Sequence, residues 1–203
     1  MIYIYNQEIN NMWYAAAIQK DRVFATAFSP GEQEVLRHLL GSLPYNVPFQ
    51  VTEKPNQLLT ELLKTLRIIF DGKDNASYGF KIALGHLSSY TRRVLNRTSL
   101  IPVGYLTTYG AIAKVAGGSP RSVGRVEASN PFPLLIPCHR VVRADFSIGS
   151  YGLGEKVKLG LLQREDRGYE ETRRLKVENK ELSLFPIKYL RKNWAKKVHI
   201  HPL

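Results

Sequence analysis

Cysteine is almost absent from this sequence of 203 residues, which contains only Cys138. One thiol excludes an internal disulfide and cannot supply the paired thiolates of a structural zinc site, so we expect a metal-free fold in a reducing compartment. The sequence also lacks a run of about 18 uncharged apolar residues and a basic N-terminal segment followed by a long apolar one. We therefore expect a soluble, intracellular protein without a membrane partner.

Acidic residues are scarce in two parts of the chain. Residues 1–90 contain eight Lys/Arg and eight Asp/Glu, whereas residues 91–143 contain eight and one, and residues 172–203 contain nine and two. The net charge of +12 therefore arises in the second half and indicates a polyanionic partner such as a phosphate backbone. The hydrophobic content of 44% excludes a disordered or fibrous class.

The first part of the chain alternates between strand and helix patterns. Two apolar runs predict a β-hairpin over residues 13–28. Apolar stripes at helical spacing predict amphipathic helices over residues 31–43 and 56–72, followed by a polar linker over residues 71–77. Because domains cluster near 100 to 150 residues, we predict two domains and a tail. Their boundaries are residues 1–77, 78–171 and a basic extension over 172–203.

A helix-turn-helix pattern follows the linker. Residues 88–98 and 107–117 have helical apolar spacing, and Gly117 with Gly118 ends the second of these helices. Ser119 is a favoured N-cap and Pro120 suits the first helical position, so another short helix is expected from there to residue 129. Such a pair of helices lays its second member on DNA.

The lone thiol lies in LLIPCHRVVR, a proline-flanked segment predicted to be extended or loop-like. A cysteine among apolar residues is often a small buried hydrophobe. A nucleophilic thiol needs a base or cation close by, and His139 and Arg140 are adjacent to Cys138. Strand neighbours point to opposite faces, so contact between Cys138 and His139 requires a turn or a bridging water.

A histidine that acts as a base also needs a carboxylate to fix its tautomer. Four acids downstream qualify: Asp145, Glu155, Glu165 and Asp166. The sequence pattern does not indicate which of the four carboxylates would hold the histidine.

Several motifs together resemble the O6-alkylguanine-DNA alkyltransferases, also called methylated-DNA-protein-cysteine methyltransferases. They are IPCHRVV, IPVGYLTTYG upstream, RSVG and SNP between these, and SYGLGEKVKLGLLQRE downstream. The resemblance covers residues 80–168 well and the first domain only in general layout. It implies an α+β fold, in which a small α/β domain of ribonuclease H-like outline precedes a helical, winged-helix domain that carries Cys138.

The resemblance also implies a function and a set of roles. The protein would flip O6-alkylguanine out of double-stranded DNA and transfer the alkyl group once to its own cysteine, as a monomer without metal or cofactor, in the cytoplasm or in a eukaryotic nucleus. The implied catalytic residues are the acceptor Cys138, its base His139 acting through a water, Glu165, Asn130 and the hydrogen-bond donor Tyr109. The residues implied to contact the base are Val141 through its carbonyl, Tyr151, Gly152, Leu153 and Pro133. Those implied to contact DNA are Arg121, which fills the vacated place in the stack, Ser122, Gly124, Arg125, Thr108 and Arg140.

The sequence departs from the family pattern in two places. After RSVG the family usually has small residues, where this chain has Arg125, Val126 and Glu127. We expect Arg125 to bind a DNA phosphate, and Glu127 to face away from DNA or to pair with Arg125. Leu153 replaces a common glycine and should narrow the pocket entrance. We therefore expect O6-benzylguanine to react poorly relative to methylated DNA; equal rate constants would contradict this.

The tail allows two interpretations. Its basic residues, interleaved with Tyr189 and Trp194, would suit DNA binding, whereas its apolar residues would equally suit a solvated helix. The residues that would pack such a helix are Leu184, Phe185, Ile187 and Leu190. His199 and His201 form a weak metal-binding pattern, and we expect no metal there.

Two other function classes are compatible with parts of this sequence. One is a helix-turn-helix regulator with a structural cysteine, which would prefer an operator sequence and retain its free thiol on alkylated DNA. The other is a cysteine hydrolase, which needs an oxyanion hole and a histidine remote in sequence. His38 and His86 are available for that role, in helix-like contexts without supporting motifs.

Overall fold

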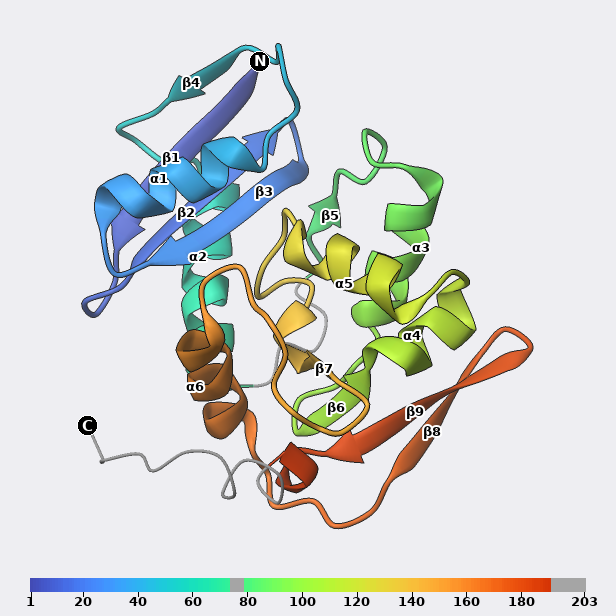
Figure 1. The fold of residues 1–203 in the computed structure, drawn as a ribbon. Coiled ribbons are helices and arrows are strands. Elements are labelled where there is room, and N and C mark those ends of the chain that lie inside the picture. The colour runs from blue at the N-terminus through green and yellow to red at the C-terminus, as the bar shows by residue number, and fades with distance from the viewer. Residues whose placement is uncertain (74–78, 191–203) are drawn as a thin grey trace.

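Five strands form a mixed sheet in the first part of the protein (Figure 1), in a computed structural model that describes residues 1–73 and 79–190. In sheet order the strands are β4 (Phe49–Val51), β1 (Ile2–Glu8), β2 (Trp13–Gln19), β3 (Arg22–Ser29) and β5 (Lys81–Ile82). The three central strands run antiparallel, and β4 and β5 pair in parallel at the edges. The predicted hairpin is thus confirmed. The sheet also extends beyond residue 77, because β5 pairs with β3.

Helices cover both faces of this sheet. Alternate residues of β2 point to opposite faces, and each face packs against a different helix. Ala15 and Ala17 share an apolar cluster with helix α1 (Glu32–Gly41). Tyr14 and other β2 residues pack in a second cluster with helix α2 (Gln57–Phe70), on the opposite face of the sheet (Figure 1). Both predicted amphipathic helices are therefore present, and each covers one face of the sheet.

The second part of the chain contains the helices expected from its sequence, α3 (Ser89–Thr98), α4 (Tyr109–Ala116) and α5 (Pro120–Ala128), followed later by α6 (Glu155–Glu165). A four-stranded sheet accompanies them. In sheet order its strands are β7 (Val141–Val142), β6 (Tyr105–Thr108), β9 (Lys180–Pro186) and β8 (Arg173–Val177). A short 3-10 turn, η1 (Cys138–Arg140), immediately precedes β7.

The expectation of a helix in the tail is wrong for residues 173–186, which form the β8–β9 hairpin (Figure 1). Strand β9 pairs antiparallel with β6, and its buried residues Leu182 and Leu184 alternate with less buried ones. The helical interpretation overlooked this period-two pattern, which buries one face of a strand. Trp194, His199 and His201 lie outside the described residues.

The two parts of the chain share one apolar core, because the cluster that contains α2 continues into the helices of the second part. Polar contacts also join them. The Thr26 amide on β3 donates to the Pro131 carbonyl at 2.9 Å, and its hydroxyl donates to the Pro133 carbonyl at 2.9 Å. The loop before Cys138 is therefore anchored on the first sheet. In the portion described, no helix is long and apolar enough to cross a membrane.

Candidate active site

Helices α4 and α5 form the predicted helix-turn-helix. Arg121 and Arg125 lie four residues apart on α5 and are exposed, so one helical face presents two cations to solvent. Gly124 on the same helix is partly exposed. This face is consistent with the role in DNA contact implied for all three residues.

Ser122 and Thr108 are also implied to contact DNA, and in the structure both cap helices. Ser122 and Ser119 form a reciprocal capping box at the start of α5, and the Ser122 hydroxyl also lies 2.7 Å from the Tyr90 hydroxyl. The Thr108 hydroxyl caps α4 by accepting from the Ala111 amide at 3.1 Å. Both side chains therefore fix the ends of the two helices.

The turn between α4 and α5 requires glycine at position 118. Gly118 has φ +86°, and a Cβ there would lie 2.5 Å from the Tyr90 hydroxyl. Only glycine combines this left-handed backbone with such a close approach. Any other residue at this position would therefore strain the turn and clash with Tyr90.

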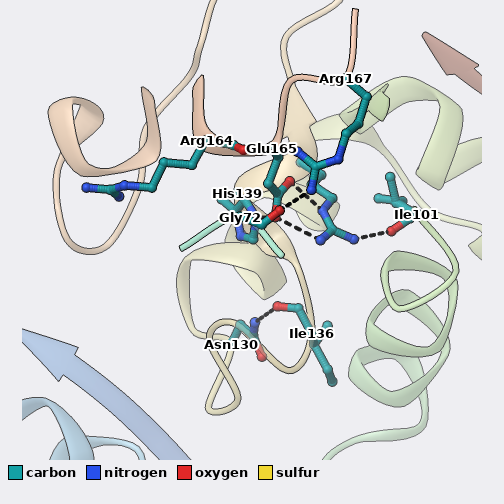
Figure 2. Close-up of polar contacts among 9 residues, drawn as sticks. Gly72, Ile101, Asn130, Ile136, His139, Arg164, Glu165 and Arg167 are labelled. Atoms are coloured by element: carbon teal, nitrogen blue, oxygen red, sulfur yellow. Dashed lines mark hydrogen bonds and ion pairs between the residues drawn. The ribbon is translucent and has the colours of Figure 1, made fainter. Parts of the chain in front are cut away.

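Cys138 begins the short 3-10 turn η1. The chain therefore turns at the cysteine and does not continue as a strand. Asn130 braces this turn. Its side-chain amide donates to the Ile136 carbonyl at 2.9 Å, drawn in Figure 2, and to Cys138 Sγ at 3.1 Å, while its Oδ1 accepts from the Phe132 amide. The sulfur is thus held by the same side chain that shapes the loop.

His139 points toward Glu165, the last residue of α6 (Figure 2). Its Nε2 lies 2.9 Å from Glu165 Oε1, and its Nδ1 has no hydrogen-bond partner among the residues described. Of the four acids left open by the sequence, Glu165 is the one that holds the imidazole. Nδ1 is therefore left to act as an acceptor when the Nε2 hydrogen donates to the carboxylate.

Arg140 is not available for DNA, which corrects the role implied for it. The side chain is 1% exposed, and Nε and Nη2 each donate to Glu165 at 2.8 Å. A third donor, Nη1, bonds to the Ile101 carbonyl. A guanidinium enclosed in this way neutralises Glu165 and cannot reach a phosphate.

These contacts determine the charge states of Glu165 and His139. Burial opposes ionisation of Glu165, but the charges and hydrogen bonds of His139 and Arg140 outweigh it and lower the pKa of Glu165 to about 2. Burial lowers the pKa of His139, so the imidazole is neutral at pH 7. A neutral imidazole with a free Nδ1 is suited to accept a proton.

Cys138 carries its proton in the free protein. Burial raises the pKa of the thiol to about 11, and the nearby Glu127 carboxyl acts in the same direction. The hydrogen bond from Asn130 and the charge of Lys158 oppose them. The sulfur therefore becomes an effective nucleophile only if its proton is removed during the reaction.

Glu127 does not pair with Arg125, contrary to one of the two expectations for it. The side chain is 7% exposed, and its Oε1 accepts from the Thr98 hydroxyl at 2.5 Å. Its other oxygen, Oε2, is buried and has no hydrogen-bond partner within the described part of the chain. Burial raises the pKa of Glu127 to about 7. The residue lies on the inner side of α5, where the family usually has a small residue.

Lys158 belongs to this site although the sequence did not single it out. Its Nζ is buried and donates to the Val141 carbonyl at 2.6 Å, and burial lowers its pKa to about 8. It precedes Glu165 by seven residues on α6, two helical turns, so both face the core. That spacing is the signal that could have identified it.

Two tyrosines lie close to the sulfur. Burial raises the pKa of Tyr109 to about 12, so its hydroxyl stays protonated, and Lys158 Nζ lies 5.7 Å from the centre of its ring. Burial and the neighbouring Cys138 raise the pKa of Tyr151 well above its usual value. Both phenols can therefore serve as hydrogen-bond donors.

A cavity of about 340 Å³ adjoins Cys138. Its walls come from the end of α5, the loop before the cysteine, the loop before α6, and β3 and α1 of the first part of the chain. Its lining residues include Glu127, Asn130, Pro133, Cys138, Tyr151 and Leu153. Gly152 also lines it, so four of the residues implied to contact the base do so, whereas Val141 contributes its carbonyl to Lys158 instead.

The histidines considered for a hydrolase have other surroundings. His86 stacks on Phe24 with ring centres 5.5 Å apart. His38 lines the cavity beside Cys138, but among the residues described no hydrogen bond joins the two side chains. The base next to Cys138 in sequence is the one with a carboxylate partner, which is not the remote histidine a hydrolase needs.

Residues 89–167 match the family model described as the DNA-binding domain of 6-O-methylguanine DNA methyltransferase. A relative from Methanocaldococcus vulcanius, named methylated-DNA-protein-cysteine methyltransferase, is 32% identical over 165 residues, which cover 78% of this chain and 94% of the relative. This chain belongs to that family. The α+β fold agrees, because the crystal structure of O6-methylguanine-DNA methyltransferase from Pyrococcus kodakaraensis strain KOD1 superposes with a TM-score of 0.64 at 26% identity, over 81% of this chain and 99% of that one.

A methyltransferase of the same name from Methanothermobacter thermautotrophicus is 42% identical over 111 residues, or 55% of this chain and 63% of the relative. The family model covers the helix-turn-helix and the cysteine loop.

Proposed function

We propose that this protein repairs double-stranded DNA by moving an alkyl group from guanine O6 to the sulfur of Cys138. One observation carries the proposal. Cys138 lines a cavity of about 340 Å³ and is followed in the chain by a neutral histidine that is held by a carboxylate and whose Nδ1 has no hydrogen-bond partner among the described residues. A structural cysteine in a DNA-binding regulator has no need of this arrangement, so the regulator is the weaker alternative.

The damaged base has to leave the double helix to reach Cys138. An alkyl group on O6 lies within the base stack, where a thiol cannot attack it in line, so the nucleotide must rotate into a pocket. The cost of unstacking is offset by an inserted side chain and by phosphate contacts. The exposure of Arg121 and Arg125 on α5 supports assigning these two contributions to them.

The transfer is a displacement at the alkyl carbon. The Cys138 sulfur forms a bond to that carbon as the carbon–O6 bond breaks, and the released electron pair stays with guanine. The thiol proton passes toward His139 Nδ1 through a water, Tyr109 donates a proton to the leaving guanine, and the proton on His139 returns to the tyrosine through water. Because the thioether resists hydrolysis, each molecule reacts once, and the reaction needs no cofactor.

The remaining residues position these groups. Glu165 holds His139, Arg140 holds Glu165, and Asn130 holds the loop and the sulfur. The Val141 carbonyl keeps a second lone pair beside its bond to Lys158, so it is able to accept from the guanine amino group as the family resemblance implies. Tyr151, Gly152, Leu153 and Pro133 would enclose the base and its substituent.

The proposal extends to the setting of the reaction. One molecule would act on one lesion through a single helix α5, so we expect it to act as a monomer. The reaction would take place where the DNA is, in the cytoplasm or in the nucleus of a eukaryote. The exposed basic face of α5 supports DNA as the partner.

Mass spectrometry provides a direct test. After incubation with a duplex that contains O6-methylguanine, the peptide spanning residues 126–140 should gain one methyl group, at Cys138. Cys138→Ser should gain none, and the same duplex without the lesion should leave the thiol free. An unmodified thiol after complete saturation with lesion DNA would refute the proposal.

A further inference from the structure

The cavity beside Cys138 contains a buried acid, Glu127. Its carboxyl group has one oxygen bonded to Thr98 and one, Oε2, without a hydrogen-bond partner in the part of the chain that is described. Since Glu127 lines the cavity together with Cys138 and Asn130, a group attached to guanine O6 would lie in the field of this carboxylate. Its pKa of about 7 means that the carboxylate predominates at pH 8.

The cations near the cavity do not cancel this charge. Arg37 of α1 lines the same cavity, but its side chain is 74% exposed and lies 3.5 Å from Glu34, so water and that acid screen it. The buried Lys158 offsets part of the charge, since it interacts electrostatically with Glu127 and Cys138, but it is not part of the cavity wall and acts on Cys138 less strongly than Glu127 does. A charge in low dielectric acts more strongly than one in water. The buried acid is therefore the main charge in the cavity wall beside the alkyl site.

We propose that Glu127 is a specificity-determining residue that selects against negatively charged O6 substituents, such as carboxymethyl, and in favour of neutral ones such as methyl. The inference rests on the proposed function. Charge repulsion between the Glu127 carboxylate and a carboxymethyl group raises the cost of placing that group beside Cys138. Repulsion of this kind rejects one substrate without improving the contacts to another.

The experiment compares single-turnover rate constants for duplexes that contain O6-methylguanine and O6-carboxymethylguanine, at pH 8. The quantity measured is the ratio of the methyl to the carboxymethyl rate constant, in the full protein and in Glu127→Gln. Glutamine has the same size and keeps an acceptor for Thr98. Removing Glu127 also changes the acidity of Cys138, but this affects both substrates alike and cancels in the ratio.

We expect the ratio to fall by about fivefold or more in Glu127→Gln, because one buried unit charge beside the substituent is removed. Glu127→Met, which is also uncharged, should behave in the same way and serves if the glutamine variant folds poorly. Glu155→Gln is the matched control, since it removes an exposed acid from the start of α6 and should leave the ratio unchanged.

The outcomes separate the two proposals. If the unaltered protein transfers no methyl group, the proposed function fails and this inference fails with it. If methyl transfer occurs but neutral substitution of Glu127 changes the ratio less than fivefold, the function stands and the role of Glu127 is overturned. A large change in Arg37→Gln with none in Glu127→Gln would overturn it as well and assign selectivity to α1.

Discussion

At the scale of single residues, Cys138 is controlled by its immediate neighbours. Burial and Glu127 raise the pKa of its thiol to about 11, whereas Asn130 and Lys158 favour the thiolate. At pH 7 only about one thiol in ten thousand is then ionised. The thiol is thereby protected from small electrophiles, and the proton has to be removed when a substrate is present.

This balance predicts how Cys138 responds to iodoacetamide. The rate of alkylation should rise about tenfold per pH unit from pH 7 to 9.5 without a plateau, because the thiolate fraction grows in that way below the pKa. Glu127→Gln removes a neighbouring negative charge, so the pKa of Cys138 should fall by about one unit and the rate at pH 8 should rise about tenfold. Lys158→Met should have the opposite effect. Mass spectrometry follows the single cysteine, and a plateau near pH 8 in the unaltered protein would contradict the prediction.

Glu165 is expected to be important for stability. Glu165→Gln leaves the buried Arg140 without its counter-ion, which should cost about 3 to 5 kcal/mol in the free energy of unfolding. Glu155→Gln, on the same helix but exposed, should change it by less than about 0.5 kcal/mol. Urea unfolding at pH 7 measures both variants, and equal effects would show that the buried ion pair has no special role.

The same residue gives stability a pH dependence with a defined sign. The folded pKa of Glu165 is about 2, below its unfolded value, so its contribution is present in full above the unfolded pKa. It is lost as the pH falls through that value toward the folded pKa. Urea unfolding from pH 6 to pH 2 should therefore show a decline that is smaller in Glu165→Gln.

Among the residues of the site, sequence reasoning identified those that belong to a motif. Cys138 and His139 were found because they are adjacent and unusual, and Glu165 because the family resemblance selected it from four acids. Lys158 and the inward direction of Glu127 were missed. Whether a charged helical residue faces the core depends on packing against other elements, which no local pattern records. Arg140 was misassigned for the same reason.

At the scale of elements, the turn between α4 and α5 depends on the conformation of Gly118. Gly118→Ala should lower the free energy of unfolding by about 2 kcal/mol or more, because it combines a left-handed backbone with a clash against Tyr90. Gly117→Ala has a backbone that essentially only glycine adopts, with φ 85° and ψ 171°, but open space around it, so it should cost about 1 to 2 kcal/mol, less than Gly118→Ala. Gly85→Ala, with neither constraint, should be nearly neutral. Thermal unfolding followed by circular dichroism ranks the three, and a neutral Gly118→Ala would refute the steric argument.

The helices were predictable because each has its own signals. Apolar residues at helical spacing predicted α2 and α3, and the N-cap Ser119 with Pro120 predicted α5. The β8–β9 hairpin was not predicted, although the buried residues of β9 alternate, because the same apolar residues also suit a helix and the pairing with β6 lies about 80 residues away in the chain. Strand β5 has only two residues and likewise depends on a remote partner. Pairing across such distances leaves little trace in the local sequence.

At the scale of the whole molecule, the reactive cavity is shared between the two parts of the chain. Residues of β3 and α1 form one wall, and the loop of Cys138 forms the other. The resemblance to the family was strong only for the second part, so sequence reasoning gave the first part no role in the site. The charge follows the same division, since the first 90 residues are neutral and the DNA-facing helices are basic. The first part therefore shapes the pocket while the second carries the chemistry.

This division of labour predicts that a residue remote from Cys138 in sequence affects alkyl transfer. Thr26 is 1% exposed, and its hydroxyl donates to the Pro133 carbonyl at the cavity wall. Thr26→Val should cost about 1 to 3 kcal/mol in the free energy of unfolding, because it leaves that carbonyl without its donor. It should also slow methyl transfer, since Pro133 and Asn130 belong to the same loop. Thr26→Ser retains the hydroxyl and should restore most of the rate, and Thr52→Val, whose hydroxyl bonds at the surface, should change neither quantity. If Thr26→Val lowers stability but leaves the single-turnover rate intact, the first sheet supports the fold without shaping the cavity.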